Sequence, residues 1–133
     1  MNIFHRIFFS TSVVALVLLA SCGDPTQGTP IAVTFSPDFQ PPSSIDTGAY
    51  AGIAATVSND PHNGGVLFSC APMGACGTFT PQAAGSAIPV CYLAPVQVPA
   101  GGSVTITASA TSDPTKFVSA TVSVMNGAPN PCP

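Results

Sequence analysis

The sequence predicts an all-β domain, a sandwich of two antiparallel sheets with about seven strands. The clearest evidence lies in two runs near the C-terminus, Ser103–Ser112 and Val118–Val124, where apolar side chains alternate with Ser and Thr. A period of two places successive side chains on opposite faces of a strand, so one face is expected to be buried and the other exposed. Similar short runs recur about every ten residues between turn-rich clusters, and no convincing helical period follows residue 22.

The other strands are expected in shorter segments. The first two, Ile31–Ser36 and Tyr50–Ser58, flank a Pro- and Gly-containing stretch, Asp38–Gly48, which we expect to be a loose edge segment. The next turn, Asn59–Gly65, has the densest turn composition of the chain. The remaining expected strands are Val66–Cys70, Thr78–Thr80, Ile88–Ala94, Ser103–Ser112 and Val118–Val124, with connections at Pro95–Gly102 and Asp113–Thr115.

The N-terminus resembles the signal peptide of a bacterial lipoprotein. Arg6 precedes an almost wholly apolar run, residues 7–20, which is shorter than the roughly 20 apolar residues of a membrane span. The run ends in Leu19–Cys22, Leu-Ala-Ser-Cys, which resembles the lipobox of such proteins. This resemblance implies cleavage before Cys22 and attachment of a diacylglycerol to its thiol, and two or three acyl chains anchor a protein stably to a membrane. Gly23 favours the outer membrane, because Asp at this position retains lipoproteins in the inner membrane.

The chain that remains after this cleavage has few charges. Of the two basic residues, Arg6 belongs to the signal peptide, so only Lys116 remains against five Asp, and Glu is absent. No basic patch is therefore available to neutralise phosphates, and we expect no nucleic-acid binding. The expected parts are a signal peptide, residues 1–21, a flexible tether, 22–30, the sandwich, 31–126, and a C-terminal tail, 127–133.

The cysteines indicate disulfide bonds. With Cys22 assigned to the lipid anchor, four cysteines remain: Cys70, Cys76, Cys91 and Cys132. An even number in an oxidising compartment predicts two disulfides, which have three possible connectivities. A zinc site with His62 as an additional ligand is disfavoured, because the pair at 70 and 76 is widely spaced and the protein is exported. A redox-active pair would need a C-x-x-C sequence at the start of a helix.

The order of the segments also resembles a bacterial immunoglobulin-like (Ig-like) repeat of the kind found in surface proteins of Acidobacteria. The likeness covers about residues 31–124 and rests on GVLFSC followed by ACGTF, on Tyr92–Pro95, and on two final strands joined by SDPTK. Phe68 stands where the family usually has Trp, and Cys91 where it more often has Thr. The resemblance implies that the two additional cysteines, Cys91 and Cys132, pair with each other, which leaves Cys70 to pair with Cys76. Domains of this family serve adhesion, spacing and display on many proteins.

The sequence contains no recognisable catalytic constellation. His62 is the only histidine after the signal peptide, no G-x-S-x-G stretch occurs, and Glu is absent. We therefore expect a non-enzymatic protein without a cofactor or a metal.

Two binding alternatives remain. A calcium site is one, because Asp60 and Asp113 both lie in turns that can meet at one end of a sandwich. A polysaccharide site is the other, with Tyr50 and Phe39 as a small aromatic patch, whereas Tyr92 is expected to be packed in the core.

Together these patterns predict a lipid-anchored protein of the cell envelope that acts in adhesion, interaction or structural display. Its partner, a protein or a glycan, is not indicated by the sequence. The loops expected to carry binding are Asn59–Gly65, with Asp60, His62 and Asn63, and Ala71–Ala75, with Pro72 and Met73.

Overall fold

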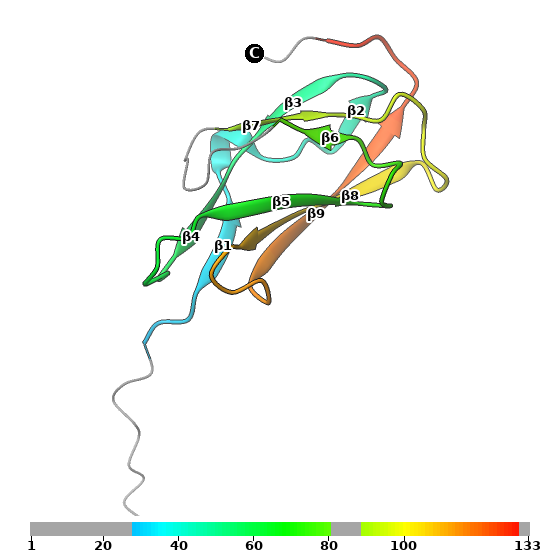
Figure 1. Ribbon diagram of the computed structural model, residues 1–133. Helices are drawn as coiled ribbons and strands as arrows, with labels where there is room; N and C mark the ends of the chain where they lie inside the picture. The colour runs from blue at the N-terminus through cyan, green and yellow to red at the C-terminus, as the bar shows by residue number, and fades with distance from the viewer. Residues whose placement is uncertain (1–27, 81–88, 131–133) are drawn as a thin grey trace, which may run out of the picture.

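The computed structural model describes residues 28–80 and 89–130, and this part of the chain is all-β apart from one 3-10 turn, η1 (Pro37–Phe39) (Figure 1). The all-β prediction is therefore confirmed. The signal peptide, Cys22, most of the tether, Ile88 and Cys132 lie outside the described residues. The strands are β1 (Ala32–Phe35), β2 (Ser44–Asp46), β3 (Tyr50–Ile53), β4 (Ala55–Ser58), β5 (Val66–Ala71), β6 (Thr78–Phe79), β7 (Val90–Leu93), β8 (Ser103–Ala110) and β9 (Phe117–Met125).

The strands form one sheet of four strands and a second layer in two parts. The four-stranded sheet has the order β2-β9-β8-β5, the three-stranded sheet has the order β3-β7-β6, and β1 pairs with β4. Only Ala54 separates β3 from β4. Its N–H donates to the carbonyl of Phe39 and its carbonyl accepts from the N–H of Ser36 (both 2.9 Å). At this residue the chain therefore passes from pairing with β7 to pairing with β1.

Two expectations about the strands were wrong. The stretch Asp38–Gly48 lies at a sheet edge, as expected, but it is not loose: it contains β2, the outermost strand of the four-stranded sheet, which pairs in parallel with residues 123–125 of β9. The run Tyr50–Ser58 is interrupted at Ala54 and forms two strands. The described residues therefore contain nine strands, where about seven were expected, and one of their pairings is parallel. Both differences arise because distant segments offer hydrogen-bond partners that local periodicity does not reveal.

The apolar residues of the two layers face each other and form the core. The predicted alternation in β8 is confirmed, since Val104, Ile106, Ala108 and Ala110 are at most 1% exposed. One buried cluster joins β8 and β9 to β3 and β7, and its largest side chain is Tyr92. A second cluster joins the end of β8 to β1 and β4. The pair β1–β4 therefore extends the second layer and covers the part of the four-stranded sheet that the three-stranded sheet leaves open.

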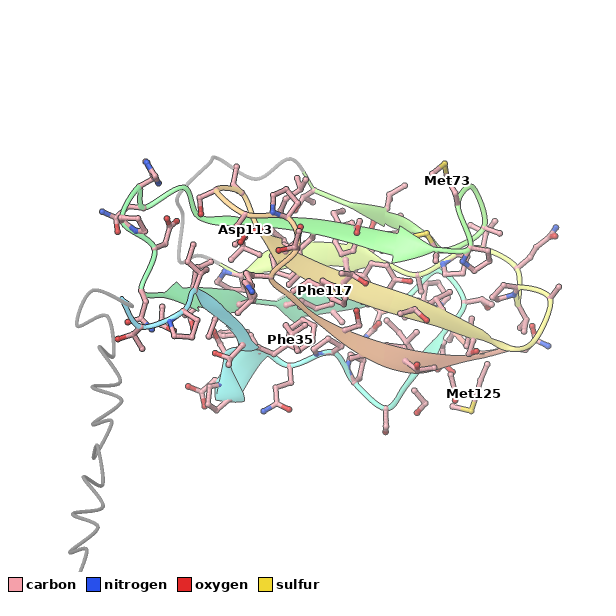
Figure 2. The ribbon with its side chains drawn as sticks, turned by 90° about the horizontal axis from the view of Figure 1, so that it is seen from below. Phe35, Met73, Asp113, Phe117 and Met125 are labelled. Carbon is pink, nitrogen blue, oxygen red and sulfur yellow. A yellow bond between two sulfur atoms is a disulfide. The ribbon has the colours of Figure 1, made fainter. Side chains whose placement is uncertain are left out.

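The loops gather at two opposite ends of these layers. We call one the tether end; it contains residues 28–31, 59–65 and 111–116. There Asn59 Nδ2 donates to the carbonyl of Pro30 (3.1 Å), and the N–H of Thr111 donates to the carbonyl of Gly65 (3.0 Å). The other is the cleft end, with residues 71–77 and 94–102. Figure 2 shows Asp113 toward the first end and Met73 at the second.

Candidate functional site

A disulfide and a buried tyrosine hold the loop at the cleft end. The bond joins Cys70, in β5, to Cys76, with Cα atoms 5.7 Å apart, and Cys76 is 4% exposed. The hydroxyl of Tyr92, in β7, donates to the carbonyl of Cys76. The Tyr92 ring packs on Phe79 (centroids 5.2 Å apart), which packs on Phe68 (5.8 Å). The base of the loop is therefore tied to both layers of the fold.

Gly77 lets this loop approach β7 closely. Its φ angle is +91°, and a Cβ atom at this position would lie 2.1 Å from the carbonyl oxygen of Leu93. Only glycine fits so near another backbone in this conformation. At the tip, the N–H of Ala75 donates to the carbonyl of Pro72 (3.1 Å), and the Met73 side chain is 96% exposed. The predicted loop residue Met73 is thus presented to the outside on a closely packed base.

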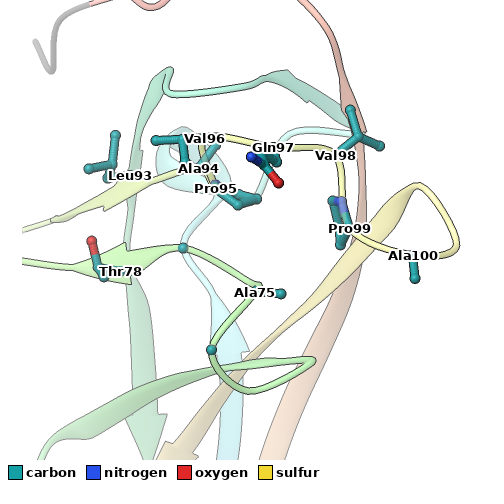
Figure 3. A pocket seen from close by; sticks show the side chains of 12 residues that line it. Ala75, Thr78, Leu93, Ala94, Pro95, Val96, Gln97, Val98, Pro99 and Ala100 are labelled. Atoms are coloured by element: carbon teal, nitrogen blue, oxygen red, sulfur yellow. The ribbon is translucent and has the colours of Figure 1, made fainter.

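A cleft of about 490 Å³ lies between this loop and the connection that follows β7 (Figure 3). Residues 74–78 contribute one wall and residues 93–100 the other, and Thr78 and Gln97 are the polar side chains among them. None of the described residues that line the cleft is charged. Val96, 82% exposed, stands at its rim. This volume is within the range of ligand pockets, and the lining, which combines polar groups with apolar side chains, suits an uncharged ligand or side chain.

The second wall of the cleft is also held by hydrogen bonds. The N–H of Gly48 donates to the carbonyl of Pro95 (3.1 Å), and the N–H of Gly102 donates to the carbonyl of Pro99 (2.9 Å). Pro99 itself is buried. Because both walls are formed before any ligand enters, binding would require little additional ordering of the backbone.

At the tether end, each of the two aspartates of the calcium alternative accepts hydrogen bonds from residues of its own turn. The Asp60 carboxylate accepts from the N–H groups of His62 (3.0 Å) and Gly64 (2.8 Å). These bonds, that from His62 first, hold its pKa below the ordinary value. The Asp113 carboxylate accepts from the hydroxyl (2.6 Å) and the N–H (3.1 Å) of Thr115, which lowers its pKa likewise. Such bonds are typical of Asp residues that stabilise turns.

These turns do meet at one end of the fold, as the calcium alternative required. The N–H of Thr111 donates to the carbonyl of Gly65 (3.0 Å), and a Cβ atom at Gly64 would lie 3.3 Å from the backbone nitrogen of Ser112, the residue before Asp113. In the described part of the chain, however, no three Asp, Glu, His or Cys side chains are grouped so that they could hold a metal ion. The geometry therefore favours turn stabilisation over metal binding for both carboxylates.

The predicted loop residues fall at both ends of the molecule. Asp60, His62 and Asn63 lie at the tether end, whereas Pro72 and Met73 lie at the cleft end, and the structure does not bring the two groups together. Val96 and Gln97 were not among the predicted loop residues, because the sequence predicts only a connection at Pro95–Gly102. The signal present was a pair of valines between two prolines in a segment without strand periodicity.

The two aromatic residues of the polysaccharide alternative, Tyr50 and Phe39, are both partly covered, and Tyr92 lies in the core. Tyr92 is 0% exposed, as expected for a core residue. Tyr50 is half-buried, and its N–H donates to Asn130 Oδ1 (3.1 Å). Phe39 is 39% exposed, and one side of its ring lies beside Gly52, where a Cβ atom would be 3.5 Å from the ring. These positions do not form the open aromatic platform that a glycan would stack on.

Comparisons of the chain with family models, with curated proteins and with solved structures give no match. Across the described residues, no helix has the length and apolar character needed to cross a membrane.

Proposed function

We propose that the protein is a non-enzymatic, lipid-anchored protein of the cell envelope whose Ig-like domain presents the cleft to a partner protein or glycan. The observation that carries this proposal is the position of the two ends. A chain anchored at Cys22 enters the fold at Gly28, in the tether end, and the uncharged cleft lies at the opposite end. An anchored domain of this form would hold its cleft away from the membrane, where a partner can reach it.

The strand order supports the Ig-like part of the proposal. A seven-stranded Ig domain places strands A, B, E and D in one sheet and C, F and G in the other. The second layer of this fold corresponds to the first of these sheets, with β1 as A, β3 and β4 as B, β7 as E and β6 as D. The four-stranded sheet corresponds to the other, with β5 as C, β8 as F and β9 as G. The disulfide differs from the antibody pattern, because it joins Cys70 to Cys76 near one end rather than strand B to strand F. Phe68 takes the place of the usual Trp on strand C.

The composition of the cleft favours binding over chemistry. Its polar side chains, Thr78 and Gln97, provide hydrogen bonds but no acid, base or activated nucleophile. Apolar contacts with Val96 and Val98 would contribute most of the affinity for a partner. A partner that inserts an uncharged apolar group between the two walls is the one this surface fits.

The anchor is tested by feeding cells an alkyne analogue of palmitate. We expect the wild-type protein to incorporate the label and to fractionate with membranes, because the lipobox directs acylation of Cys22. The Cys22→Ala variant should lose both properties. If the variant still carries label and still fractionates with membranes, the proposed anchor is wrong.

The role of the cleft is tested by photo-crosslinking in intact cells. A photoreactive residue at position 96 should give a crosslinked product, and one at position 62, at the tether end, should not. The Ala75→Arg substitution places a long charged side chain at the cleft wall and should remove the product. A product that forms equally from position 62, or that persists in a folded Ala75→Arg variant, would contradict this assignment.

A further inference from the structure

Two large apolar side chains are exposed together on the outer face of the four-stranded sheet. Leu67 is 62% exposed and Phe117 is 61% exposed. Both are paired with the same residue of the central strand, since Leu67 in β5 and Phe117 in β9 each lie opposite Ser109 in β8. Adjacent strands are about 4.8 Å apart, so the two side chains leave the sheet about 10 Å from each other.

The neighbouring row of the same face is polar. Ser69, Thr107 and Ser119 are paired across the same three strands, and the hydroxyls of Thr107 and Ser119 are 2.8 Å apart. Phe117 begins β9, directly after the turn that contains Asp113, so the apolar row is the one nearest the tether end (Figure 2). The exposed apolar pair is therefore located at the end where the chain leaves the domain toward its N-terminus.

The length of the preceding chain limits how far this end can be from the anchor. Residues 28–31 line a shared cavity with Asp113 and Lys116, the residue before Phe117. Cys22 is only six residues before Gly28, and an extended chain spans at most about 3.3–3.6 Å per residue, so the anchored residue is within about 20 Å of the tether end. A tether of this length keeps the apolar pair at a high effective concentration beside the bilayer, which makes even a small contact area effective.

The charges at the tether end do not attract an anionic surface. Lys116 is the only basic residue there, whereas Asp60 and Asp113 are both acidic. Their carboxylates are engaged by their own turns, and His62 lies in the same region. With one base against two acids, electrostatic attraction to anionic lipids is not the driving force, so contact with a bilayer must depend on apolar side chains.

From these observations we propose that the tether end docks on the lipid bilayer, with Phe117 inserted at the level of the headgroups and Leu67 beside it. The inference rests on the proposed anchor at Cys22. Docking of this row fixes the orientation of the domain: it turns the outer face of the four-stranded sheet toward the bilayer and keeps the tether end nearer to the membrane than the cleft end. Phe and Leu side chains are typical of surfaces that bury their apolar face at the boundary between the headgroups and the acyl chains.

The chain contains no tryptophan, so a single one reports the environment of the position where it is introduced. The Phe117→Trp protein, purified from membranes and reconstituted in phosphatidylcholine vesicles, should emit at shorter wavelength than in detergent-free buffer and should lose intensity when brominated lipids are included. The matched control is Val96→Trp, at an exposed position of the cleft end, which should show neither change. High salt or added phosphatidylglycerol should leave the Phe117→Trp signal unchanged, because the contact is apolar.

A second variant tests the apolar pair itself. In the Phe117→Trp background, Leu67→Asn should reduce the quenching while the circular dichroism spectrum remains that of the folded protein, since position 67 is exposed. Equal quenching of the two tryptophan reporters, or quenching that disappears in high salt, would overturn docking through this surface. A lipid-free dimer that Phe117→Ser dissociates would also overturn it, and would assign the pair to a second copy of the chain.

The mass of the same preparation distinguishes failure of the anchor from failure of docking. If the protein carries no acyl chains, the proposed anchor is wrong, and the N-terminal residue is then coupled chemically to a lipid. Shifted and quenched Phe117→Trp emission in that sample supports the docking surface independently of acylation. Unshifted emission in either anchored sample rejects it.

Discussion

The hydroxyl of Tyr92 offers the sharpest test of how the cleft end is held together. Tyr92 is 0% exposed, and its hydroxyl donates to the backbone carbonyl of Cys76. Cys76 is itself only 4% exposed. The Tyr92→Phe substitution keeps the ring and its packing on Phe79 but leaves the carbonyl without this donor. An unsatisfied buried acceptor costs about 1–3 kcal/mol. In a domain of this size each kcal/mol lowers Tm by about 4–8 °C, so we expect a loss of at least about 4 °C at neutral pH.

The same hydroxyl predicts a loss of stability in alkali. Burial raises the pKa of Tyr92 from 10.0 to about 12. Because the folded state favours the neutral phenol, this contribution is fully present below pH 10 and is lost as the pH rises from 10 toward 12. A pKa difference of this size corresponds to about 2–3 kcal/mol. The wild-type protein should therefore lose stability over this interval, whereas Tyr92→Phe should not, and the two stability curves should converge or cross.

The assay is urea unfolding followed by circular dichroism, at neutral pH and at steps between pH 9 and pH 12. Tyrosinate absorbance of the folded protein reports the ionisation directly. Tyr50→Phe is the matched control, because it removes the other tyrosine of the chain, which is half-buried, and leaves Tyr92 in place. The reasoning is refuted if Tyr92→Phe is as stable as the wild type at neutral pH and shows the same alkaline loss.

Three further substitutions test the loops. Gly77→Ala should lower the free energy of unfolding in urea by more than about 2–3 kcal/mol, because the added Cβ would lie 2.1 Å from a backbone carbonyl oxygen. The matched control is Gly74→Ala, which has a similar φ of +80° but no atom within 4 Å of the added Cβ and should cost much less. Equal losses in the two variants would contradict the close approach at Gly77. Replacing Cys70 and Cys76 by Ser should cost about 2 kcal/mol from loop-closure entropy, and no change in the urea midpoint would show that the bond does not restrain the unfolded chain. The pKa of Asp60 is lower in the folded protein than its ordinary value of 3.8, so the ionised carboxylate stabilises the fold at pH values above 3.8, and this contribution is lost as the pH falls below that value. Asp60→Asn should therefore show a shallower decline of stability in acid than the wild type. An unchanged decline would argue against this linkage.

The candidate site was only partly predictable from the sequence. Met73 was expected to lie in an exposed loop, and it is 96% exposed at the cleft end. Asp60 was expected in the same role, but its carboxylate binds the backbone of its own turn at the opposite end. Val96 was overlooked, because a loop residue acquires a role only when another loop, far away in the sequence, forms the facing wall.

The sequence by itself determined the character of the strands and which of their faces are buried. In β8 and β9 this information is local, because successive side chains of a strand point to opposite sides whatever the strand pairs with. Pairing partners are not local. β2 is a strand because residues 123–125 of β9 offer it a parallel edge, and the chain changes partner at Ala54 because Phe39 and Ser36 bond to its backbone. The tertiary structure alone decided that residues 28–31 and the cleft lie at opposite ends, since that depends on how strands distant in the sequence are ordered within the two layers.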